Sequence, residues 1–71
     1  MNKPKFPNKM IDQAYDSLNG KIITHSPTNQ KFTDQDNNSN YDYHSVKWLA
    51  DNNYLIEFFD TNRFVYLYKI K

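Results

Sequence analysis

Apolar residues near the start of the chain recur with the period of an α-helix. They share one side of a helical wheel, and polar residues occupy the other side: Met10, Ile11, Ala14, Tyr15 and Leu18. Asn8 follows Pro7 and has a side chain that can cap a first helical turn, whereas Asn19-Gly20 supplies a left-handed stop. The pattern therefore predicts a helix between Asn8 and Asn19.

The next part of the chain predicts one short strand and a polar loop. Residues 21–25 are rich in β-branched side chains and end at Ser26-Pro27, which is typical of a strand. From Thr28 to Asn40 the apolar content falls to Phe32 alone, so we interpret this segment as a loop. A brief helical turn from Gln30 to Asp34, anchored by Phe32, is compatible with the same residues.

A second helix is predicted to begin near Ser39 or Asn40 and to run to about Asn53. Ser39 and Asp42 have the spacing of a capping box, in which the acid also meets the positive end of the helix dipole. The helical wheel separates two sets of side chains. The core-facing set is Tyr43, Val46, Leu49 and Ala50, and the opposite set is Tyr41, His44, Trp48 and Asp51.

Two strand-forming runs near the end of the sequence predict a β-hairpin. They cover residues 54–59 and 63–70, are separated by Asp60-Thr61-Asn62, and are expected to place Asp60 opposite Arg63. Alternation then gives two apolar faces. One face carries Tyr54, Ile56, Phe58, Val65 and Leu67, and the other carries Leu55, Glu57, Phe59, Phe64, Tyr66, Tyr68 and Ile70. The sequence leaves open which face is buried, and a free strand edge can pair with another chain.

These elements predict a single α+β domain over residues 8–71, preceded by a flexible tail over residues 1–7. Their order is helix, short strand, loop, helix and C-terminal β-hairpin. A chain of 71 residues buries only about 60% of its unfolded surface, so there is no room for separate cofactor and substrate domains.

Composition removes several functional classes. The chain has no cysteine, and His25 and His44 lack the spacing of metal ligands, so we expect neither disulfides nor a metal site. A single glycine cannot build a Walker loop or a dinucleotide-binding fingerprint, so we expect no cofactor. The carboxylates are scattered over different elements. We therefore expect a protein that acts by binding and is not an enzyme.

Charge and hydropathy narrow the expected partners. Nine Lys and Arg against eight Asp and Glu give a net charge of +1, well short of the balance typical of a dedicated nucleic-acid binder. The sequence has neither a secretory h-region nor an apolar run of about 20 residues that could span a bilayer. The expected location is cytoplasmic, without a membrane partner.

The order of elements resembles the winged-helix domain. The resemblance rests on Ser45 to Phe58, a run that looks like a recognition helix leading into the first wing strand, and it extends over roughly 50 residues. It implies a DNA-binding regulator whose helix reaches base edges and whose wing tip reaches phosphate. The residues at those positions are Tyr41, His44, Lys47 and Trp48 in the helix, and Thr61, Asn62 and Arg63 at the tip.

Aromatic residues provide two candidate binding surfaces. Trp48 is turned outward beside Tyr41 and His44 on the wheel, which is the composition of an interface hot spot. Equally, Trp48 can close the core by packing on the loop or on Phe6. The second surface is the aromatic face of the hairpin, with a charged anchor at the loop: Phe64, Tyr66, Tyr68 and Arg63.

We therefore expect a small modulator or inhibitor of a protein partner. The composition is similar in style to accessory proteins of phages and other mobile elements, including anti-CRISPR inhibitors. A homodimer through the hairpin is compatible with the same surfaces. The alternative is a winged-helix transcriptional regulator that binds DNA through Lys47, Trp48, Asn62 and Arg63.

Overall fold

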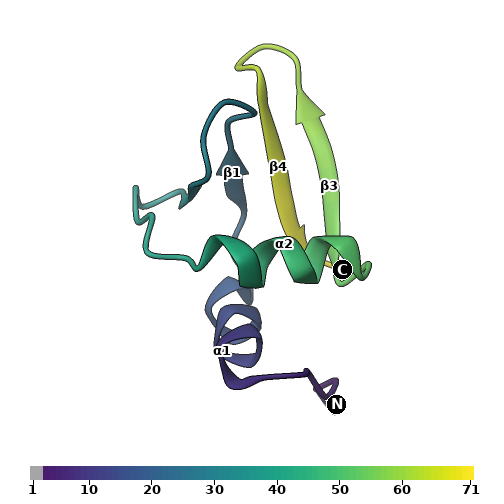
Figure 1. The fold of residues 1–71 in the computed structure, drawn as a ribbon. Coiled ribbons are helices and arrows are strands. Elements are labelled where there is room, and N and C mark those ends of the chain that lie inside the picture. Colours follow the sequence, from purple (N-terminus) through teal and green to yellow (C-terminus); the bar gives the residue numbers. More distant parts are fainter. Residues whose placement is uncertain (1–2) are drawn as a thin grey trace.

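The computed structural model describes residues 3–71, which form two helices and one four-stranded antiparallel sheet (Figure 1). In chain order the elements are α1 (Lys9–Leu18), β1 (Ile23–His25), β2 (Phe32–Asp34), α2 (Tyr43–Asp51), β3 (Leu55–Asp60) and β4 (Val65–Ile70). The strands lie in the order β2-β1-β4-β3. The α+β class and the order of helix, strand, helix and hairpin are confirmed.

Helix α1 begins and ends as its sequence predicts. The side chain of Asn8 accepts a hydrogen bond from the backbone N–H of Ile11 at 2.9 Å, and Gly20 has a positive φ of 74° just after the helix. Ile11 and Leu18 are buried in the core, together with Ala14 between them. Met10 belongs to the same apolar stripe but is 57% exposed, because it lies at the edge of the face that packs.

Strand β2 corrects the interpretation of residues 28–36. The segment is not a continuous loop, and the helical turn that the sequence allows from Gln30 to Asp34 does not form, because Phe32 to Asp34 pair antiparallel with β1. A strand places Phe32 in the core, with its ring centroid 4.8 Å from that of His25, while the backbone is paired with β1. A lone apolar residue carries no helical period, so the sequence signal for this strand is weak.

Helix α2 begins later than predicted, at Tyr43. Its N-cap is Asp42, whose carboxylate accepts hydrogen bonds from the backbone N–H of Ser45 at 2.9 Å and from its hydroxyl at 2.7 Å. These bonds lower the pKa of Asp42, the hydroxyl being the larger cause. Ser39 is not the cap, because Asp34 holds the preceding segment in a loop by accepting the N–H of Asn38. The helix ends at Asp51, close to the predicted end.

The hairpin register differs from the expected one by two residues. Asp60 pairs with Val65 rather than with Arg63, and residues 61–64 form a four-residue loop. A two-residue turn would need positive φ at both Thr61 and Asn62, which the β-branched Thr61 disfavours. A shift of two residues keeps each side chain on its predicted face, so the division of the hairpin into two faces still applies.

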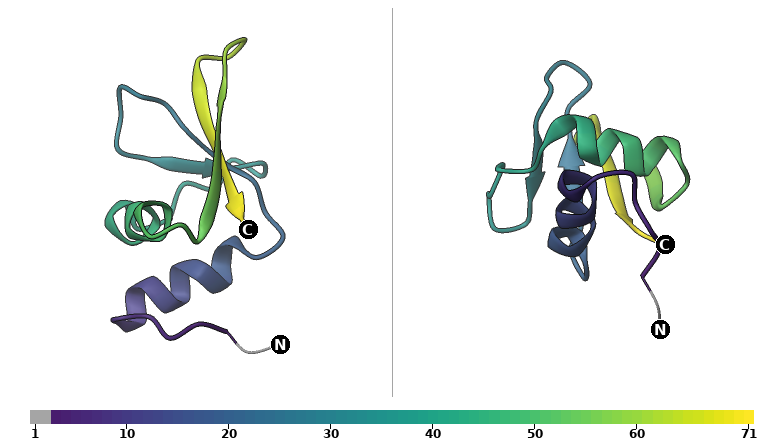
Figure 2. Two further views of the ribbon diagram at one scale, coloured as in Figure 1. Left: turned by 90° about the vertical axis from the view of Figure 1, so that its right-hand side faces the viewer. Right: turned by 60° about the horizontal axis from the view of Figure 1, so that its bottom comes forward.

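Helix α1 lies below α2, across the end of the strands, and α2 packs on one side of the sheet (Figures 1 and 2). We call this side the front face. It buries Ile23, Leu55 and Tyr68 against Val46 and Leu49 of α2, and α1 packs beneath α2. Neither helix covers the opposite face of the sheet. The hairpin residues that point to this face are Ile56, Phe58, Val65 and Leu67. The hairpin extends beyond the helices at its loop end, so its upper part is not covered on the front face either.

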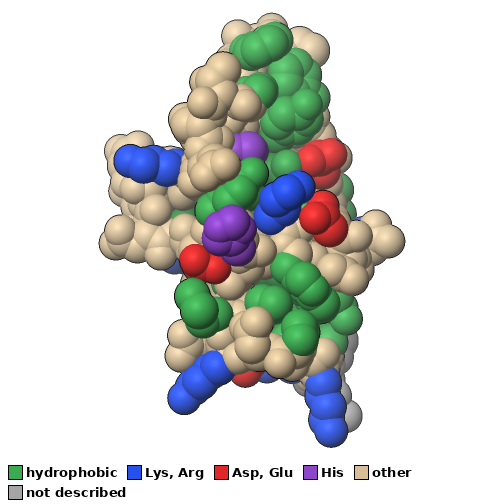
Figure 3. Space-filling model, viewed as in Figure 1, with side chains coloured by type: hydrophobic (Ala, Val, Ile, Leu, Met, Phe, Trp, Pro, Cys, Tyr) green, Lys and Arg blue, Asp and Glu red, His purple; other side chains and the backbone are tan. Residues whose placement is uncertain are grey.

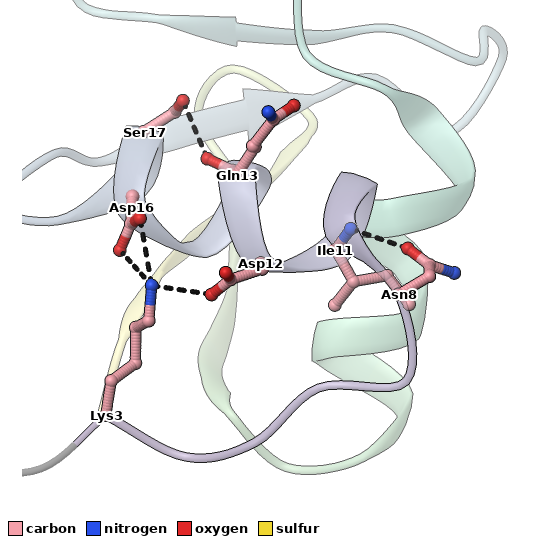
Figure 4. Close-up of polar contacts among 7 residues, drawn as sticks. All are labelled: Lys3, Asn8, Ile11, Asp12, Gln13, Asp16 and Ser17. Atoms are coloured by element: carbon pink, nitrogen blue, oxygen red, sulfur yellow. Dashed lines mark hydrogen bonds and ion pairs between the residues drawn. The ribbon is translucent and has the colours of Figure 1, made fainter.

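The segment before α1, expected to be a flexible tail, lies against both helices from residue 3 onward; residues 1 and 2 lie outside the described residues. The Lys3 ammonium contacts the carboxylates of Asp12 at 2.6 Å and Asp16 at 3.0 Å (Figure 4). These two carboxylates raise the pKa of Lys3. The Phe6 ring lies 4.9 Å from that of Tyr15, so the segment adds an aromatic contact to α1.

Candidate binding surface

A continuous row of aromatic rings connects the core with the hairpin loop. We call it the aromatic ladder: Phe32, Tyr68, Tyr66, Phe59 and Phe64. Successive ring centroids are 5.5, 6.5, 4.9 and 5.3 Å apart. Exposure rises along the row, from 2% at Phe32 to 39% at Phe59 and 65% at Phe64. The ladder is thus anchored in the core at one end and open to solvent at the other.

Strand alternation and the position of α2 explain this gradient. Phe59 pairs with Tyr66, and all the strand residues of the ladder point to the front face. Helix α2 crosses that face near the start of β3 and covers the base of the ladder, but it does not reach the loop end (Figure 1). Hydrophobic side chains accordingly gather over the upper hairpin in the space-filling view (Figure 3). Phe58, on the opposite face, is 46% exposed.

The hairpin loop is organised by Asp60. Its carboxylate accepts the backbone N–H of Asn62 at 3.0 Å and pairs with Nε of Arg63 at 2.8 Å. The hydrogen bond from Arg63 is the main cause of the lowered pKa of Asp60. The backbone carbonyl of Asp60 accepts the N–H of Phe64 at 2.8 Å, which closes the loop. These bonds give the loop a defined shape.

Phe64 completes this loop in an unfavourable backbone conformation. Its φ is 58°, in the left-handed region, where Cβ approaches the following carbonyl oxygen and costs L-residues roughly 1–2 kcal/mol. A bulky aromatic residue is uncommon there, and glycine or asparagine is the usual occupant. The Phe64 ring is largely exposed, and its aromatic partner is Phe59. Little burial within the protein therefore offsets the backbone strain.

An open groove of about 420 Å³ lies where the front face meets α2. Lys47 of α2 lines it on one side, and Glu57 and Tyr68 line it on the sheet side. The Tyr68 hydroxyl donates to Oε2 of Glu57 at 2.6 Å. Burial and this bond to a carboxylate raise the pKa of Tyr68, burial being the larger cause. The hydrogen bond from Tyr68 therefore holds the Glu57 carboxylate beside the groove, at the base of the ladder.

The three residues predicted as one surface differ in burial and in their contacts. Tyr41 is half-buried and donates its hydroxyl proton to Asp34 of β2. Trp48 is half-buried and stacks on Tyr54, with ring centroids 5.8 Å apart. It also meets Phe6 edge-on, which is the packing alternative considered for it. His44 is exposed. Contacts with other segments therefore occupy Tyr41 and Trp48 and leave His44 as the exposed member of the three.

Among the hairpin residues predicted as a surface, Phe64 and Tyr66 both contact Phe59, and Tyr68 is buried next to Tyr66. Phe59 lies on the predicted aromatic face, but it is not among the residues predicted to contact a partner. Its exposure follows from the height of α2 on the sheet, which the sequence does not reveal. Phe58 is not among the predicted contact residues either, although strand alternation places it on the face opposite Phe59.

The positions expected to contact DNA carry internally paired charges. Lys47 lies 3.6 Å from the carboxylate of Asp51, and Arg63 is paired with Asp60. Asn62 is exposed at the loop tip, whereas Trp48 packs against Tyr54 and against Phe6 of the N-terminal segment. These four positions therefore do not form one basic surface.

The described residues contain no group of three or more His, Cys, Asp or Glu side chains arranged to hold a metal ion. Within residues 3–71, neither helix has the length and apolar composition needed to cross a bilayer. Comparisons with protein-family models, curated proteins and solved structures found no match to this chain.

Proposed function

We propose that this protein is a small modulator or inhibitor of a protein partner, of the kind carried by phages and other mobile elements, and that it binds through the exposed end of the aromatic ladder. The single observation that carries the proposal is Phe64, a largely exposed aromatic side chain held in a left-handed conformation at a projecting hairpin tip. Residues kept in strained conformations concentrate at functional sites.

The composition of the tip supports a protein partner. Phe59 and Phe64 of the ladder and Phe58 on the opposite face are all more than a third exposed, and Tyr66 is half-buried beside Phe59. Aromatic residues and arginine are enriched at protein interfaces, and Arg63 lies in the same loop. Because this loop is already ordered by Asp60, binding requires less loss of conformational freedom than an unstructured loop would.

The test is site-specific crosslinking followed by measured binding. A photoreactive phenylalanine analogue replaces Phe64 in the full chain, and the captured protein is identified, purified and titrated with unlabelled wild-type protein. We expect Phe64→Ser and Phe59→Ser to weaken its binding at least about tenfold, as hot-spot residues do. Met10→Ser is the matched control, because it removes an exposed apolar side chain from α1.

The same titration separates the proposal from the DNA-binding alternative. Binding through aromatic rings should depend weakly on salt, and Lys47→Glu should leave it nearly unchanged. Binding to mixed-sequence duplex DNA would instead fall steeply with salt, because phosphate contacts release counterions. Unaltered partner binding by both serine variants, or duplex binding abolished by Lys47→Glu and Arg63→Glu, would overturn the proposal.

A further inference from the structure

One edge of the sheet offers unpaired backbone groups. β3 is an outer strand, and the N–H of Lys71 donates to the carbonyl of Tyr54 at 3.2 Å. Along an antiparallel strand, the backbone N–H and C=O groups of successive residues point alternately toward and away from the paired strand. Because the carbonyl of Tyr54 points toward β4, the backbone groups of Ile56 and Phe58 do so as well. The backbone N–H and C=O groups of Leu55, Glu57 and Phe59 therefore point away from β4. Within residues 3–71, no strand or loop pairs with them.

This edge lacks most of the features that usually prevent strand pairing. β3 has six residues, contains no proline, and pairs with β4 in an unbroken register without a bulge. β2, at the other edge of the sheet, has only three residues. Long, apolar, uncovered edge strands are sites where another chain adds a strand. Glu57 is the one charged residue in the interior of β3.

A groove that could receive side chains of an added strand lies in front of this edge. The groove described above lies between α2 and the front of the sheet, and Leu55 and Glu57 contribute to its lining. A strand added to β3 would direct alternate side chains to the front, toward the groove and the aromatic ladder. The other side chains would extend the uncovered face on which Phe58 lies. Backbone bonds would supply affinity, and the front positions would supply specificity.

We infer that β3 takes up an extended segment of the partner protein as a fifth strand, with a Lys or Arg placed opposite Glu57 and apolar side chains opposite Leu55 and Phe59. Glu57 accepts the Tyr68 hydroxyl but, among the described residues, forms no ion pair. An opposite charge directly across from it is favourable in a sheet. The inference rests on the proposed function and names the chemistry of the partner.

The same charge argues against a second copy of this chain as the occupant. Antiparallel pairing of two β3 strands with Leu55 opposite Phe59 places Glu57 of one copy opposite Glu57 of the other. Like charges directly opposite each other destabilise a sheet. A shift that separates these carboxylates also removes the match between Leu55 and Phe59. The segment that fits best is therefore one of different sequence.

The probe is a capped heptapeptide, Thr-Val-Thr-Lys-Thr-Phe-Thr, added to the full chain and followed by amide hydrogen exchange in NMR spectra. In the free protein we expect slow exchange at Ile56 and Phe58, and fast exchange at Leu55, Glu57 and Phe59. The peptide should slow the second group about tenfold when about nine-tenths of the protein is bound. A peptide N-methylated at the alternate positions that face β3 should have no effect.

A charge exchange tests the register. Wild type should bind the lysine peptide about fivefold more tightly than the same peptide with glutamate in place of lysine, and Glu57→Lys should bind the glutamate peptide about fivefold more tightly. Asp36→Lys is the matched control, because it changes net charge equally at an exposed position in a distant loop. Three outcomes would overturn the inference: no protection at saturating peptide, no reversal in Glu57→Lys, or protection that rises with protein concentration alone. Crosslinking through Phe64 without protection of the edge amides would leave the proposed function standing and remove only the added strand.

Discussion

The Tyr41 hydroxyl donates a hydrogen bond of 2.5 Å to Oδ2 of Asp34, joining the segment that leads into α2 to the end of β2. The other carboxylate oxygen of Asp34 accepts the backbone N–H groups of Asp36 and Asn38, and Lys21 lies 3.8 Å away. Asp34 thus connects three separate segments of the chain. The hydrogen bond from Tyr41 is the main cause of the lowered pKa of Asp34. Burial, together with the same bond, raises the pKa of Tyr41 to about 12.

Asp34→Asn should destabilise the protein at neutral pH. A carboxylate whose pKa is lowered by folding stabilises the fold above its unfolded-state pKa, and this contribution is lost as pH falls through the folded-state value. The variant should therefore lose less stability than wild type between about pH 7 and about pH 3. Urea denaturation at both pH values measures the difference. Asp36→Asn, in the same loop and exposed, should behave like wild type.

Phe64→Asn should preserve stability while weakening partner binding. Asparagine tolerates the left-handed conformation, so relief of strain offsets the lost contact with Phe59, and the free energy of unfolding should change by less than about 1 kcal/mol. Partner binding should fall at least about tenfold. Chemical denaturation and the titration described above provide the two values. Tyr68→Asn, at the buried base of the ladder, should instead cost about 3 kcal/mol; equal losses of stability in both variants would contradict the assignment of Phe64 to binding.

Leu55→Ala and Leu67→Ala should differ sharply in stability. Leu55 is 5% exposed beneath α2, so its truncation should cost about 3 kcal/mol. Leu67 is half-buried on the face that neither helix covers, and about 1 kcal/mol is expected there. Far-ultraviolet circular dichroism during thermal unfolding compares the two variants. The reverse order would mean that the helices pack on the other face of the hairpin.

Phe6→Ala should expose Trp48. The indole stacks on Tyr54 and meets the Phe6 ring edge-on, so its fluorescence should be blue-shifted relative to an exposed indole in wild type and should move to longer wavelength in the variant. Loss of the aromatic pairs made by Phe6 should reduce stability by about 1 kcal/mol. Emission spectra of the native protein measure the shift. Met10→Ala, exposed on α1, should leave the spectrum unchanged.

The helices and the two faces of the hairpin were predictable because each depends on local periodicity. The sequence predicts the start of α1 from Asn8, its buried face from the apolar stripe, and the hairpin faces from the alternation in residues 55–70. None of these depends on contacts between distant parts of the chain. β2 was not predictable, since Phe32 to Asp34 form a strand only by pairing with β1. The cap of α2 depends similarly on Asp34, whose bonds hold residues 36–40 in a loop.

The candidate site was predicted only in part, for the same reason. Phe64 and Tyr66 follow from the aromatic composition of the hairpin, whereas the exposure of Phe59 and the burial of Tyr68 depend on where α2 crosses the sheet. The interaction of Trp48 with Phe6 joins residues far apart in sequence. Helical wheels describe one helix at a time and contain no information about a segment that folds over it.

The strand order has a consequence for the folding kinetics. β3 and β4 are neighbours in sequence and can pair through a short loop, whereas Ile23 of β1 meets Tyr68 of β4 across most of the chain. Closing that long loop loses chain entropy before any burial compensates for it. The hairpin and both helices can therefore form early, while the joining of β1 to β4 sets the pace at which the core is completed.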